Sequence, residues 1–88
     1  MTENEWIDQR VQDLLVGAGF GPLPFGTLLE RLVDVAVGEG RAPIVRLLTD
    51  TRERRLLFYT RPLDNSLRRL RKRGLVRPAP GRRGWVIA

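Results

Sequence analysis

Residues 61–76 read RPLDNSLRRLRKRGLV, and they combine a regular leucine spacing with a run of positive charge. Leu63, Leu67 and Leu70 recur at i, i+4 and i+7, which places them on one side of an α-helix at about 100° per residue. The pattern therefore predicts a basic amphipathic helix over residues 61–73, with its leucine side facing the body of the protein.

Both ends of this expected helix carry start and stop signals. Pro62 stands in the first turn, where its missing N–H removes no helical hydrogen bond, and either Thr60 or Arg61 would be the N-cap. Gly74 suits the left-handed position just after a helix end. We therefore expect the helix to stop abruptly before residue 75.

The face opposite the leucines is strongly cationic. Basic residues in the last turn complement the negative end of the helix dipole, but those nearer the start and the middle have no such role. This distribution predicts a positive face presented to solvent and suited to a polyanion. Its centre holds Asn65, Arg69 and Lys72, and its flanks hold Arg61, Arg68 and Arg73.

Two short apolar segments after the expected helix predict a β-hairpin, Leu75–Arg77 and Gly84–Ile87. The tip between them is rich in proline and glycine. It also contains Arg82 and Arg83, at a place where packing alone requires no positive charge. Trp85 has two roles open to it, which are packing over the base of the hairpin and stacking against a partner.

One pattern of residue spacing runs from the expected basic helix into the expected hairpin. The pattern Leu63-x3-Leu67-x2-Leu70-x3-Gly74-Leu75-Val76, with a hairpin closing on Gly84-Trp85-Val86, resembles the recognition helix and wing of winged helix-turn-helix domains, as in many bacterial transcription regulators. The resemblance covers residues 60–88, or about 50–88 if the middle of the chain is helical. It implies a winged helix-turn-helix fold with a small C-terminal β-hairpin, and with the additional N-terminal helices that we expect, the fold is mainly α.

The resemblance also implies the positions that face DNA. In the recognition helix, the groove-facing or flanking positions are those of Asn65, Ser66, Arg68, Arg69 and Lys72, and Arg82 and Arg83 occupy the wing tip. Together with the flanking Arg61 and Arg73, these nine residues are the candidate DNA-binding set.

The charge of the chain is divided between its two halves. Residues 1–40 hold two basic and seven acidic side chains, for a net charge of −5, whereas residues 41–88 hold fourteen basic and three acidic side chains, for +11. Thirteen of those fourteen are arginine, whose planar guanidinium suits phosphates and guanine edges. Because clustered cations displace counterions from phosphates, the basic half favours a polyanionic partner.

Two helices are expected in the acidic half, over residues 3–16 and 27–38. Apolar residues recur at helical intervals in both, until glycines end each pattern. A capping box is expected at the start of each, from Thr2 with Glu5 and from Thr27 with Glu30.

The length of 88 residues predicts a single domain, residues 1–88. We interpret residues 1–40 as an acidic helical scaffold or dimer surface, and residues 41–88 as the basic recognition part.

Residues 43–60 allow two interpretations. In one, Asp50 caps a short helix over residues 51–59, immediately before the basic helix. In the other, the apolar runs 43–48 and 55–59 pair as a hairpin with a charged turn between them. We favour the helix because it supplies the element that usually precedes such a basic helix.

Missing residue types exclude several kinds of chemistry. The chain has no cysteine and no histidine, so it has no disulfide, no thiol nucleophile, no imidazole base and neither of the commonest zinc ligands. Its carboxylates are scattered, without a pair that suggests an acid–base couple. We therefore expect no enzymatic activity and no cofactor or metal.

No apolar run approaches the ~20 residues of a membrane span, so we expect a cytoplasmic protein without membrane contact.

These observations lead to the hypothesis of a small winged-helix protein that binds double-stranded DNA in transcription regulation or another DNA transaction. The expected helix would enter a major groove, where Asn65 pairs with adenine and Arg68 or Arg69 with guanine. The tip arginines Arg82 and Arg83 would hold phosphates or reach the minor groove. A homodimer on a two-fold site is expected, with the two acidic helices as its contact surface.

An alternative hypothesis places the arginines at a protein interface. The chain would then be a winged-helix adaptor that binds an acidic surface of a polymerase, a nuclease or the replication machinery, with Trp85 or Tyr59 as anchors. Structured RNA is a third partner compatible with the charge.

Overall fold

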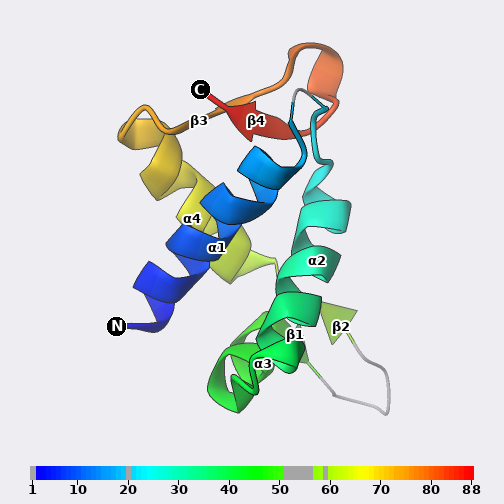
Figure 1. The fold of residues 1–88 in the computed structure, drawn as a ribbon, viewed down its shortest axis with the longest axis vertical. Coiled ribbons are helices and arrows are strands. Elements are labelled where there is room, and N and C mark those ends of the chain that lie inside the picture. The colour runs from blue at the N-terminus through cyan, green and yellow to red at the C-terminus, as the bar shows by residue number, and fades with distance from the viewer. Residues whose placement is uncertain (1, 20, 51–56, 59) are drawn as a thin grey trace.

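The computed structural model of the chain describes residues 2–19, 21–50, 57–58 and 60–88. Within these ranges α1 and α4 lie side by side, α2 runs next to them with α3 against its end, and the β3–β4 hairpin covers the opposite end (Figure 1). A 3₁₀ turn, Pro80–Arg82, lies at the tip of that hairpin. The expected mainly helical fold with a C-terminal hairpin is confirmed. The elements in chain order are α1 (Glu3–Gly17), α2 (Phe25–Gly38), α3 (Ala42–Leu48), β1 (Thr49–Asp50), β2 (Leu57–Phe58), α4 (Arg61–Lys72), β3 (Val76–Pro78) and β4 (Trp85–Ile87).

The core forms where the apolar sides of the four helices meet, and two residues outside the helices complete it, Leu23 before α2 and Val76 in the hairpin. Trp6 is its largest member, and its indole N–H donates a hydrogen bond to Glu39 Oε1 at 3.2 Å, which satisfies the polar atom of a nearly buried ring. The helical members are Trp6, Ile7, Val11 and Leu15 of α1, Leu28, Leu29, Leu32, Val33 and Ala36 of α2, Ile44 and Leu48 of α3, and Leu63, Leu67 and Leu70 of α4.

The first helix begins as predicted, and the second does not. Thr2 is the N-cap of α1, and its Oγ1 accepts a hydrogen bond from the Glu5 backbone N–H at 3.2 Å. α2 begins at Phe25 with Pro24 as its N-cap, and no side chain caps it. The capping box expected at Thr27 is therefore wrong, because the fixed φ of proline already sets the extended residue that precedes the helix.

The middle of the chain differs from the favoured interpretation. α3 leads directly into β1, which pairs antiparallel with β2. The helix expected over residues 51–59 is therefore wrong at residues 57–58, and the rest of that range lies outside the described residues. The alternative hairpin is right that residues 57–58 form a strand in an antiparallel pair, but its first strand is wrong: the partner is Thr49–Asp50 and not residues 43–48. These are helical because Ile44 and Leu48, one turn apart, both point into the core.

This arrangement changes what precedes the basic helix. The element before α4 in the described ranges is β2, and Thr60 is the N-cap of α4 without a side-chain cap hydrogen bond. A tight turn between two helices therefore does not lead into α4.

The C-terminal hairpin has the expected strands and an additional partner. β3 and β4 pair antiparallel, and Leu23, between α1 and α2, exchanges two backbone hydrogen bonds with Trp85 at 3.1 and 2.9 Å. Gly84 lies beside this bridge with φ +124, and a Cβ there would overlap the carbonyl oxygen of Leu23. The half-buried Trp85 ring packs against the core. The hairpin is thus tied to the helices by backbone as well as by side chains.

Candidate nucleic-acid interface

α4 turns one apolar side to the protein and one polar side to solvent. Leu63, Leu67 and Leu70 are at most 1% exposed and pack into the core. Each buried leucine contributes roughly 1.5–3 kcal/mol to the free energy of folding, so together they fix the rotation of the helix about its axis. Side chains on the far face are therefore held at defined positions on the surface.

The C-terminus of α4 is a Schellman turn, as Gly74 predicted. Gly74 has φ +74, and its N–H donates to the carbonyl oxygen of Arg71 at 3.0 Å. The Leu75 N–H donates to the carbonyl oxygen of Leu70, also at 3.0 Å. One hydrogen-bonded turn therefore joins the helix to the hairpin and sets the direction in which the hairpin leaves.

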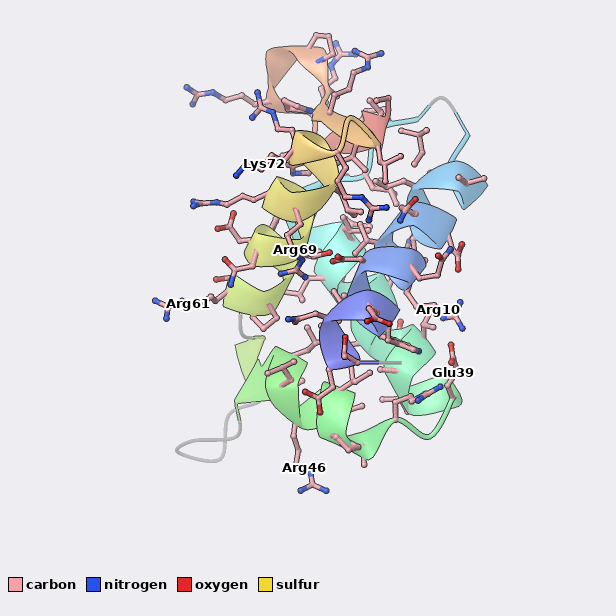
Figure 2. All side chains as sticks on the ribbon, turned by 90° about the vertical axis from the view of Figure 1, so that its left-hand side faces the viewer. Arg10, Glu39, Arg46, Arg61, Arg69 and Lys72 are labelled. Atoms are coloured by element: carbon pink, nitrogen blue, oxygen red, sulfur yellow. The ribbon has the colours of Figure 1, made fainter. Side chains whose placement is uncertain are left out.

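The outer face of α4 carries exposed cations and one amide. Arg68 keeps 77% of its side chain in solvent, although its Nε lies 3.2 Å from the Asp64 carboxylate one turn earlier. Such a surface pair contributes little to stability and leaves the guanidinium accessible. Figure 2 shows Arg61 and Lys72 projecting from the same side of α4, one toward each end. The exposed residues of this face are Arg61, Asn65, Arg68 and Lys72.

Two of the nine candidate residues contact α1, one of them from a buried position and the other, Arg69, with its side chain 37% exposed. Ser66 is fully buried, and its hydroxyl donates a hydrogen bond to Asp8 Oδ1. Arg69 donates from Nε to Asp8 Oδ2 at 3.0 Å and from Nη2 to Oδ1 at 2.8 Å, and this hydrogen bonding to Asp8 raises the pKa of Arg69. A buried hydroxyl cannot touch a DNA groove. Ser66 and Arg69 therefore position α4 on α1.

The hairpin tip presents Arg82 and Arg83, both exposed. A hydrogen bond from the Ala79 N–H to the carbonyl oxygen of Gly84, 2.8 Å long, closes the tip. Arg82 has φ +57 and is the one non-glycine residue with a positive φ in the described ranges. That conformation costs an L-residue roughly 1–2 kcal/mol. The fold thus retains an arginine at a position that glycine would occupy with less strain.

Strand β3 adds a cation outside the candidate set drawn from the sequence. Val76 is buried and Arg77 exposed, as the alternation of side chains along a strand requires. Arg77 and Arg83 line the same hollow of about 440 Å³ beside the tip. The sequence could have indicated that Arg77 is exposed, because side chains alternate between the two faces of a strand and the preceding residue, Val76, is apolar.

A second hollow, of about 550 Å³, lies beside the outer face of α4. Its lining brings Phe25, at the start of α2, next to polar side chains of α4. No local pattern pointed to Phe25, because the hollow is lined by positions about 40 residues apart in the sequence. The residues that line this hollow are Phe25, Thr60, Arg61, Asp64, Asn65 and Arg68.

The acidic half of the chain borders α4 on its other flank. Arg73 is exposed but lines a hollow together with Glu5 and Asp8 of α1. It therefore lies at the boundary between the acidic side chains of α1 and the basic side chains of α4. We define the basic surface as the exposed cations and amide on the outer face of α4, together with the exposed cations of the hairpin; Arg71 is exposed too but lies nearer the leucine side of α4 and is not counted. The members of the basic surface are Arg61, Asn65, Arg68, Lys72, Arg77, Arg82 and Arg83, with Arg73 at its border.

Comparison of the chain with known protein families, with curated proteins and with solved structures gave no match in any of the three. Within the described ranges, no group of three or more histidine, cysteine, aspartate or glutamate side chains is placed to hold a metal ion. None of the helices in these ranges combines the length and the apolar character needed to cross a bilayer.

Proposed function

We propose that the chain binds double-stranded DNA through the basic surface, as a small winged-helix-like regulator of transcription or of another DNA transaction. The observation that carries this proposal is the hydrogen-bonded turn at Gly74, which connects the helix α4 to the C-terminal hairpin. α4 buries its leucines and exposes Arg61, Arg68 and Lys72, and a single turn joins it to a hairpin whose tip exposes Arg82 and Arg83. A helix in a major groove, flanked by a loop on the phosphates, needs this arrangement.

Each part of the basic surface has a distinct role in the proposal. The 12 residues of α4 span about 18 Å, and a B-DNA major groove admits a helix of this kind. Asn65 reads adenine and Arg68 reads guanine, because their side chains offer the matching pairs of hydrogen-bonding groups. Arg82 and Arg83 hold phosphates or enter the adjacent minor groove. The cations at the two ends of α4 hold the phosphates that border the groove.

A titration with single-charge variants tests the proposal. Fluorescence anisotropy with a labelled duplex of arbitrary sequence, at about 50 mM salt, measures the sequence-independent part of binding. We expect Arg61→Ala, Lys72→Ala and Arg82→Ala each to weaken binding several-fold. The matched control is Arg31→Ala, which removes the same charge from an exposed residue of α2 outside the basic surface and should change the affinity by less than about twofold.

The alternative function, an adaptor for an acidic protein surface, has one supporting observation. The hollow beside the hairpin tip joins apolar lining from Pro22 and Val86 to the cations Arg77 and Arg83, which suits an acidic peptide with an apolar side chain. Tyr59, one of the two anchors expected for this function, lies outside the described residues. Absence of DNA binding in the wild-type titration, with the protein folded, would favour the adaptor over the DNA-binding protein.

A further inference from the structure

The end of the molecule formed by the C-terminus of α2 and by α3 carries a largely apolar hollow of about 320 Å³. Ala36, Val37 and Val45 line it, together with Arg41 and Arg46. The Val37 side chain is 61% exposed. A single exposed valine is common on protein surfaces, so the charges around the hollow decide whether it is a docking surface.

The charges along this side of α2 change sign at Val37. Glu30 and Asp34 precede Val37 by seven and three residues, so at about 100° per residue both lie within roughly 60° of it around the helix. Both are exposed. Arg41 and Arg46 lie beyond Val37 and line the hollow itself. Glu39, also beyond Val37, pairs with Arg10 at 2.9 Å and lies 4.0 Å from Arg41 Nε, which leaves Arg46 as the cation of this end that the surface offers to a partner. The surface therefore runs from acidic through apolar to basic over the length of α2 and the start of α3.

We propose that this surface binds a second copy of the chain in a two-fold symmetric dimer. The two Val37 side chains meet near the axis, and the Arg46 side chain of each copy faces Glu30 and Asp34 of the other. A two-fold interface must be complementary to itself, because the same patch meets its copy in reverse order. An acidic–apolar–basic order fulfils that requirement, whereas a patch of one charge would repel its copy.

The location of this surface leaves the basic surface uncovered. The hollow is at the α3 end of the molecule, and the β3–β4 hairpin is at the opposite end (Figure 1). Figure 2 shows Arg46 directed away from Lys72 and from the hairpin. The dimer does not depend on the proposed function, but it would supply the two copies that a two-fold DNA site requires.

Sedimentation equilibrium tests the dimer without DNA. We expect the wild-type mass to rise with concentration from 10.1 kDa toward twice that value. Val37→Glu should weaken association at least about tenfold, because it places a carboxylate in the apolar centre of the interface. The matched control is Val16→Glu, since Val16 of α1 is 66% exposed and lies outside this surface. Far-ultraviolet circular dichroism establishes that both variants fold, and Val37→Ser serves if the glutamate variant does not.

Charge exchange tests the predicted pairing of the two copies. Arg46→Glu and Asp34→Arg should each weaken association, and the double variant should restore it to within about threefold of wild type, because the exchanged charges again face each other. A wild-type chain that stays monomeric up to about 1 mM, or equal association of Val37→Glu and Val16→Glu, would overturn the proposal. If the double variant associates more weakly than either single variant, the proposed pairing of Arg46 with Asp34 of the other copy is wrong.

Discussion

Arg69 of α4 holds Asp8 of α1 through two hydrogen bonds, from Nε to Oδ2 at 3.0 Å and from Nη2 to Oδ1 at 2.8 Å. Ser66 donates to the same carboxylate from a fully buried position. Within the described ranges, no buried side-chain nitrogen or oxygen lacks a hydrogen-bond partner. The leucines of α4 fix its rotation against the core, and this polar cluster fixes it against α1. Together they decide which cations face outward.

Replacing Asp8 should therefore destabilise the fold. Asp8→Ala removes the acceptor shared by Ser66 and Arg69 and leaves a buried hydroxyl without a partner. We expect the free energy of unfolding, measured with urea, to fall by roughly 1–3 kcal/mol. Asp13→Ala is the control, because the Asp13 carboxylate pairs with Arg10 on the surface and should contribute less than about 1 kcal/mol. Equal losses in the two variants would show that the Asp8 cluster acts as an ordinary surface pair.

A methyl group at Gly84 should detach the hairpin from the helices. The Cβ of Gly84→Ala would overlap the Leu23 carbonyl oxygen, and the φ of +124 is itself unfavourable for alanine. We expect a loss of more than about 2 kcal/mol in the free energy of unfolding, together with a change in the emission of Trp85.

The matched control for this variant is Gly38→Ala. Gly38 ends α2, and a Cβ at this position would have open space for 4 Å around it, so alanine there should be neutral or stabilise slightly. If Gly84→Ala unfolds at the same urea concentration as the wild type, the Leu23–Trp85 bridge does not hold the hairpin.

The elements that the sequence predicted well are those with local signals. α4 and the hairpin follow from leucines one turn apart, from Gly74 in a left-handed position and from strand residues on both sides of a proline-rich tip. The α1 start follows from Thr2 and Glu5, three residues apart. Each of these signals lies within one turn or one strand, so no knowledge of the tertiary fold was needed to interpret it.

The features that escaped prediction depend on contacts between distant segments. A helical wheel places Arg69 on the face opposite the leucines, yet α1 covers that flank, so Arg69 and Ser66 meet Asp8, which lies 61 and 58 residues away in the sequence. β1 and β2 contain two residues each, too few for a period of two to appear. A wheel drawn for one helix cannot show how many neighbours that helix has.

The Glu39 carboxylate predicts a pH dependence of stability. It accepts hydrogen bonds from Arg10 Nε at 2.9 Å and from the Trp6 indole at 3.2 Å, and these bonds, that from Arg10 foremost, lower the pKa of Glu39. Because the pKa is lower in the folded than in the unfolded chain, the stabilisation is complete above the ordinary glutamate pKa of about 4.3 and is lost as the pH falls through the folded value.

Glu39→Gln tests this dependence. The variant keeps an acceptor for the Trp6 indole but no longer titrates, so its free energy of unfolding should fall less than that of the wild type between about pH 6 and pH 3. Urea unfolding followed by tryptophan emission at the two pH values measures the difference. Identical losses in the two proteins would mean that Glu39 plays no part in acid destabilisation.

The basic surface predicts a steep salt dependence of DNA affinity. About five or six phosphate contacts should make the logarithm of the association constant fall with the logarithm of salt concentration at a slope of roughly −5. Arg82→Ala/Arg83→Ala should make this slope shallower by about 2, because each tip arginine neutralises one phosphate in the proposal. Asn65→Ala, an uncharged change on the same surface, should keep the wild-type slope and alter only the preference among sequences. Anisotropy titrations at several salt concentrations measure all three slopes. An affinity independent of salt would exclude phosphate neutralisation as the mechanism, and a double variant with the wild-type slope would remove the hairpin tip from the interface.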